Sequence, residues 1–107
     1  MQAGDKMFPE TTLKILGAFP KKDLYIMYGQ TEAAPRLTYL LPKIASKKPE
    51  SIGKAIPDVE VRVVDATGGE CASGEVGEII ARGDNIMMGY WNNPDETKGV
   101  IKDGWLY

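Results

Sequence analysis

The pattern of hydrophobic and polar residues changes near residue 50 and predicts two subdomains, residues 1–50 and 51–107. In the first, the apolar run Leu24–Tyr28 is typical of a short buried strand. A helix is expected to begin at Pro9, where a missing N–H costs nothing, and to end near Gly17. A strand before this helix would complete a βαβ-type unit with two parallel strands.

In residues 51–107 the pattern favours short antiparallel strands. Val59–Val64 alternates apolar and polar positions, as a half-buried strand does, and Gly77–Arg82 predicts a second strand. Asn93-Pro94 predicts the start of a helix that ends near Val100, and Asp103-Gly104 predicts a hairpin turn. The predicted fold class is therefore α+β: a βα(β) piece of an α/β subdomain, then a small antiparallel sheet or distorted β-barrel.

The segment that joins these parts, residues 33–51, is predicted to be a loop because it contains three prolines. Arg36–Leu41 is its one strand-like stretch. Three lysines, Lys43, Lys47 and Lys48, gather in it. Small clusters of charge are usually solvated, so we expect an exposed loop here rather than an anion site.

The strongest candidate for chemistry follows the strand that ends at Tyr28. Gly29 breaks the apolar run, and Thr31 and Glu32 stand directly beyond it. The carboxyl ends of strands are where open α/β sheets place ligands. A threonine hydroxyl can donate to a phosphate, a glutamate suits Mg²⁺ carried by a nucleotide, and a tyrosine ring can stack on a base. Taken alone, the same residues also fit a surface Thr-Glu at the first turn of a helix.

This stretch resembles the Tyr-Gly-x-Thr-Glu signature of the adenylate-forming enzymes, which include acyl-coenzyme A synthetases, luciferases and the adenylation domains of peptide synthetases. Three further stretches, Gly74–Gly83, Met88–Thr97 and Asp103–Tyr107, resemble that family's Gly-Glu…Arg-Gly, Gly-Tyr-x-x-x-Pro-x-x-Thr and Gly-Trp motifs. Their order and spacing match as well. One motif would be weak evidence, whereas several in register over almost the whole chain are strong.

The resemblance implies a part for several residues. Thr31 and Glu32 would be catalytic, with Glu32 as the Mg²⁺ ligand and Tyr28 stacked on adenine. The residues implied in binding ATP are Gly4, Asp5, Tyr28, Gly29, Gln30 and Thr31. The family often has Gly or Ala where Asp5 stands, which leaves the role of that position open. Leu37, Tyr39 and Leu40 are candidate walls of an acyl pocket, with core packing as an equal alternative.

The resemblance also implies a reaction: ATP activates a carboxylic acid, more readily an acyl chain than an amino acid, and the acyl group passes to coenzyme A or a carrier-protein thiol. The family's phosphate loop, its Thr-Gly-Asp and its small C-terminal domain are not in the sequence, so we expect an inactive internal piece of a larger enzyme. The first strand and the last, Trp105–Tyr107, are expected to be edges without their neighbours, which predicts a homodimer or a strand exchange. The alternative is a non-catalytic, β-rich interaction or scaffold module.

The composition of the chain excludes several classes of binding partner and catalytic site. The net charge is −2, which favours neither nucleic acid nor an anionic membrane as a partner. The chain has one cysteine and no histidine, so an internal disulfide, a Cys–His nucleophile and a Cys/His zinc site are excluded. No apolar run is long enough to span a bilayer. A lone cysteine is typical of a reducing compartment, and we expect the cytoplasm.

Overall fold

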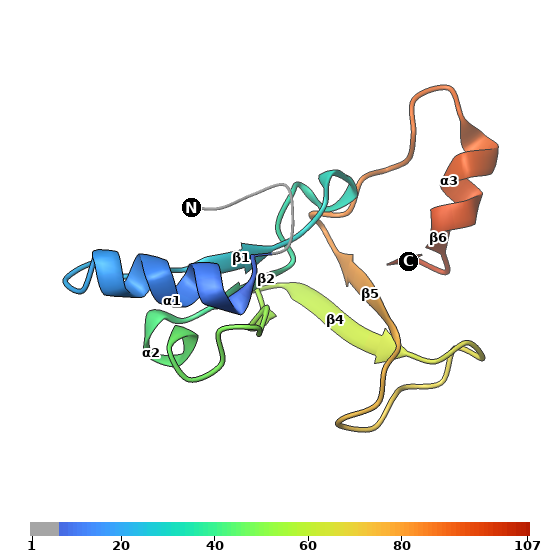
Figure 1. Cartoon of the computed structure of the whole chain (residues 1–107). Helices are drawn as coiled ribbons and strands as arrows, with labels where there is room; N and C mark the ends of the chain where they lie inside the picture. The colour runs from blue at the N-terminus through green and yellow to red at the C-terminus, as the bar shows by residue number, and fades with distance from the viewer. Residues whose placement is uncertain (1–6) are drawn as a thin grey trace.

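The computed structural model describes residues 7–107. Its elements are, in chain order, α1 (Pro9–Ala18), β1 (Ile26–Tyr28), the 3₁₀ helix η1 (Thr31–Ala33), β2 (Thr38–Leu40), α2 (Pro42–Ala45), β3 (Lys54–Ala55), β4 (Val59–Val64), β5 (Glu78–Gly83), α3 (Pro94–Val100), β6 (Ile101–Lys102) and β7 (Trp105–Leu106) (Figure 1). Within residues 7–107 the predicted helices and strands are confirmed, with bounds that differ by one or two residues.

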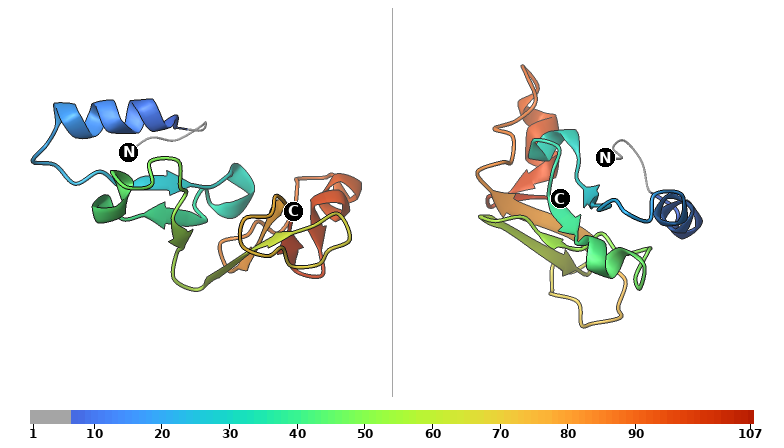
Figure 2. Two further views of the ribbon diagram at one scale, coloured as in Figure 1. Left: turned by 60° about the horizontal axis from the view of Figure 1, so that its bottom comes forward. Right: turned by 90° about the vertical axis from the view of Figure 1, so that its left-hand side faces the viewer.

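The first sheet holds the turn that carries the candidate site. It is antiparallel, in the order β1-β2-β3, with Met27 opposite Tyr39. Helix α1 covers one of its faces (Figure 2, left), where Leu16 packs on a small core that includes Ile26 and Leu40. The parallel strand predicted before α1, like Gly4 and Asp5, falls in residues 1–6 and lies outside the described residues.

The second sheet is antiparallel in the order β4-β5-β7-β6. The distorted barrel expected for this half is wrong for the described residues, because the sheet is open and β4 and β6 form its two ends. Four strands of two to six residues are too few and too short to curl round and close. The predicted hairpin turn is confirmed: Asp103 and Gly104 have φ of 50° and 79°, as a type I′ turn requires.

The loop predicted for residues 33–51 is wrong in one place. Pro42 opens the short helix α2, with Lys43 in its single turn. Prolines are typical of loops, but the first position of a helix tolerates one. Lys43, Lys47 and Lys48 are all exposed, as the solvated interpretation requires.

One buried cluster links the candidate turn to the second sheet. Ala33 and Leu37 pack with Ala81 of β5 and Leu106 of β7, each at most 2% exposed. The chain is nevertheless elongated, with a radius of gyration of 15.5 Å and extents of 47 × 32 × 23 Å. A compact chain of this length has a radius of gyration of about 13 Å. The division at residue 50 stays a prediction, and this cluster draws on both sides of it.

Candidate nucleotide site

The turn after β1 is shaped by a close backbone approach. A Cβ added to Gly29 would lie 2.3 Å from the carbonyl oxygen of Pro35, so a side chain would push these two segments apart. The backbone then enters η1, where the N–H of Ala33 donates to the carbonyl of Gln30 at 3.0 Å. This fold-back leaves Thr31 exposed and Glu32 half-buried at the tip of the turn.

Glu32 is held through its side chain and its backbone by one distant segment. The hydroxyl of Tyr90 donates to Oε1 of Glu32 at 2.7 Å, and the N–H of Met87 donates to the Glu32 carbonyl at 2.8 Å. The bond from Tyr90, followed by one from the residue's own N–H, lowers the pKa of the Glu32 carboxyl. The same contact raises the pKa of Tyr90. At neutral pH the pair is therefore a carboxylate and a neutral phenol.

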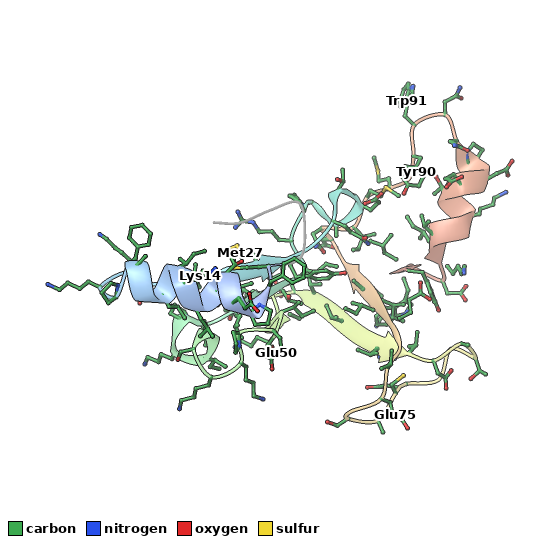
Figure 3. All side chains as sticks on the ribbon, viewed as in Figure 1. Lys14, Met27, Glu50, Glu75, Tyr90 and Trp91 are labelled. Atoms are coloured by element: carbon green, nitrogen blue, oxygen red, sulfur yellow. The ribbon has the colours of Figure 1, made fainter. Side chains whose placement is uncertain are left out.

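The segment that holds Glu32 is residues 84–93, which connects β5 to α3 and is called here the connecting segment. Figure 3 labels Tyr90 and, at the outer bend of the segment, Trp91. Nearer β5, the Asn85 side-chain amide donates to the carbonyls of Ala33 and Arg36 at 3.1 and 2.8 Å. Contacts at three points thus tie the turn to the connecting segment.

The structure brings together five of the predicted site residues, Tyr28, Gly29, Gln30, Thr31 and Glu32, in one turn. Tyr28 packs partly against the buried cluster of Ala33 and Leu37, so some of its ring is engaged in the core. Leu37, proposed as an acyl-pocket wall, is 2% exposed in that same cluster, as the core-packing alternative requires. The catalytic and binding roles of the five residues stay predictions.

Two hollows of the surface lie away from this turn. One of about 90 Å³ lies beside the C-terminal end of α1 and the loop after it. Another, of about 200 Å³, is lined by Tyr39, Leu40, Leu41, Ile44, Lys48, Ser51, Gly53 and Lys54. Tyr39 and Leu40, the other two candidate acyl-pocket walls, thus border a hollow. Neither of these two hollows includes a residue of the Tyr28–Glu32 turn.

The donor set around Glu32 fits a magnesium ion carried by a nucleotide. No three of the acidic, cysteine or histidine side chains in residues 7–107 gather where they could hold a metal. The hydroxyl of Tyr90 donates to Oε1 of the Glu32 carboxylate, and the N–H of Glu32 itself is a second donor to this carboxylate. Mg²⁺ is commonly bound by one or two carboxylates together with substrate phosphates and water. A single protein carboxylate is sufficient for such a site.

The sequence alone assigns no role to Tyr90 or Asn85. Tyr90 belongs to the Gly-Tyr-x-x-x-Pro-x-x-Thr motif, and its spacing from Pro94 and Thr97 is a local signal for it. Asn85 stands 52 residues from the Ala33 carbonyl that it contacts. No local pattern connects positions so far apart, so the contact becomes visible only in the folded chain.

The model of the AMP-binding enzyme family matches residues 1–91, and the chain belongs to that family. It is 44% identical over 80 residues to a long-chain-fatty-acid–CoA ligase of Salmonella typhimurium, covering 75% of this chain and 14% of the relative. It is 40% identical over 80 residues to an indoleacetate–CoA ligase of Aromatoleum aromaticum, covering 75% and 16%. The chain thus spans a small part of its relatives.

Solved structures of other proteins share the fold of this chain. The o-succinylbenzoate–CoA synthetase of Bacillus subtilis, in complex with its acyl-adenylate intermediate, superposes with a TM-score of 0.85 at 25% identity, over 96% of this chain and 26% of that one. VinN superposes with a TM-score of 0.84 at 30% identity, over 97% and 26%. The shared fold covers nearly all of this chain.

Proposed function

We propose that this chain is a segment of an ATP-dependent ligase that activates a carboxylic acid as an acyl-adenylate and passes the acyl group to a thiol. The observation that carries the proposal is the ionised Glu32 at the tip of a turn in a chain of the AMP-binding family. In the reaction, the carboxylate of the acid attacks the α-phosphorus of ATP and pyrophosphate leaves. The thiol of coenzyme A or of a carrier protein then takes the acyl group.

Each residue of the turn has a part in this proposal. Glu32 holds Mg²⁺, which when bound neutralises charge on the phosphates. Exposed Thr31 donates its hydroxyl to the α-phosphate, and the free part of the Tyr28 ring stacks on adenine. Gly29 and Gln30 bring the backbone close to the nucleotide. Gly4 and Asp5 border the adenine in this proposal and lie outside the described residues.

The substrate proposed is an organic acid with an apolar body. The relatives are named for acids as different as long-chain fatty acids and indoleacetate, which share that feature. Among the predicted pocket walls, Tyr39 and Leu40 line the hollow of about 200 Å³. A test is ATP–pyrophosphate exchange by the complete enzyme with acyl acids of increasing length, aryl acids and amino acids. Exchange with amino acids alone would contradict the proposal.

The chain by itself is proposed to be inactive, because the turn supplies one metal ligand and part of an adenine wall. Charge-stabilising groups are each worth about a hundredfold in rate or more, and most of the family's are absent from this sequence. We expect ATP·Mg to bind the 107-residue chain more weakly than millimolar in a calorimetric titration. A micromolar dissociation constant would contradict this prediction.

A homodimer formed through exposed sheet edges remains part of the proposal. The expectation that Trp105–Tyr107 is an unpaired edge is wrong, because β7 lies between β5 and β6. The ends of the second sheet are β4 and β6, and unpaired edges recruit other chains. Light scattering of the purified chain at millimolar concentration is expected to give twice the monomer mass. A monomer mass at that concentration would contradict it.

The alternative of a non-catalytic, β-rich module predicts a compact, self-sufficient fold. The elongated shape and the small buried clusters speak against it.

No helix in residues 7–107 has the length and apolar character needed to cross a bilayer. A cytoplasmic location is proposed on the lone cysteine, which is typical of a reducing compartment.

A further inference from the structure

Hydrogen bonds connect helix α3 to the Glu32 carboxylate through the backbone and the side chain of Tyr90, and this connection is called here the relay. Oγ1 of Thr97, in the first turns of α3, donates to the Asn93 carbonyl and accepts the backbone N–H of Tyr90, both at 2.9 Å. The Tyr90 hydroxyl then donates to Oε1 of Glu32 at 2.7 Å. This last bond joins Tyr90 to Glu32, which stand 58 positions apart in the sequence.

The glycine beside Tyr90 lets this relay form. A Cβ added to Gly89 would lie 2.8 and 2.9 Å from Cγ2 and Oγ1 of Thr97, and the residue has a φ of +147° that L side chains rarely adopt. Pro94 fixes the start of α3, and the Asn93 side chain accepts the N–H of Glu96 at the same end. These contacts therefore set the direction of the Tyr90 side chain, and they depend on the spacing of Gly89, Tyr90, Pro94 and Thr97.

The aim of that phenol matters because a carboxylate side chain is otherwise free to rotate. The Tyr90 bond engages Oε1 and restricts the rotation of the carboxylate, which can still offer lone pairs to a cation. Met87 and Asn85 hold the backbone beneath it. Partners of this kind, which do not touch a metal but orient its ligand, commonly change metal affinity by about 10–100-fold.

We propose that Tyr90 is a positioning residue for the metal-binding carboxylate of Glu32 and that Thr97 positions Tyr90 in turn. The proposal rests on the proposed function, in which Glu32 binds the Mg²⁺ of MgATP. A purely structural tyrosine would affect the stability of the fold and leave the affinity for the cation unchanged. The two roles are therefore separable by a measurement of metal binding.

The test uses the complete enzyme with ATP bound and no acid present, so that no turnover occurs. Mn²⁺ replaces Mg²⁺, and the loss of the free Mn²⁺ signal in electron paramagnetic resonance gives its dissociation constant. Tyr90→Phe keeps the ring and removes the hydroxyl, and Thr97→Val keeps the shape and removes the relay. The control is Tyr25→Phe, the same chemical change on a 43% exposed tyrosine that is not part of the Tyr28–Glu32 turn.

We expect the dissociation constant of Mn²⁺ to rise about tenfold in Tyr90→Phe and less in Thr97→Val, with no change in Tyr25→Phe. Wild-type affinity in Tyr90→Phe overturns this inference when Glu32→Gln, measured alongside, weakens Mn²⁺ binding. Wild-type affinity in Glu32→Gln instead overturns the metal role of Glu32 and with it the proposed function. If Tyr90→Phe does not fold, Thr97→Val decides: a wild-type constant there overturns the inference.

Discussion

Glu32→Gln in the complete enzyme is expected to reduce the rate of acyl-adenylate formation by about two to three orders of magnitude, the usual cost of losing one charge-stabilising group. The amide keeps the size of the side chain and loses its charge, so the proposed Mg²⁺ site would lose its protein ligand in this segment. The bond from Tyr90 lowers the pKa of Glu32, so the native side chain is charged at neutral pH and loses its charge only as the solution becomes acidic. The measurement is acid-dependent ATP–pyrophosphate exchange at pH 7.

The matched control for this prediction is Glu50→Gln, the same chemical change on an exposed side chain (labelled in Figure 3). Glu50 follows α2 and is not part of the Tyr28–Glu32 turn. We expect wild-type exchange in this variant. An unchanged exchange rate in Glu32→Gln would contradict the assignment of Glu32, whatever the control shows.

Leu106→Ala is expected to lower the free energy of unfolding by about 2–5 kcal/mol, the range for a buried leucine cut back to alanine. Leu106 is 1% exposed in β7, where it pairs with Ala81 of β5 and with Ile101 of β6. It also packs with Ala33 and Leu37, so its side chain joins the second sheet to the candidate turn. Because a small domain is stable by only about 5–15 kcal/mol, this loss is a large part of the total.

Urea unfolding of the 107-residue chain, followed by the fluorescence of its two tryptophans, measures this effect. Val76→Ala is the control, since Val76 is 97% exposed and exposed substitutions change stability by less than about 0.5 kcal/mol. Equal midpoints for the two variants would show that the cluster around Leu106 does not hold the sheets together.

Elements set by local rules could be predicted closely. Helix α3 begins at Pro94 with Asn93 as its cap, and the hairpin at Asp103-Gly104 has the φ values that its residues favour. The Val59–Val64 strand has the bounds that its alternation predicts. The prediction of a barrel is wrong because closure depends on how many strands meet and how they curve, and no local sequence pattern determines this.

The sequence by itself determined the family, the contiguous Tyr28–Glu32 turn and most helices and strands, because each of these depends on residues within a few positions of one another. The tertiary structure alone decided how that turn is held. Asn85, Met87 and Tyr90 reach it from more than fifty residues away, and Leu37 enters a core shared with Leu106. Contacts of that range arise only when the chain folds back on itself, since their partners share no sequence period.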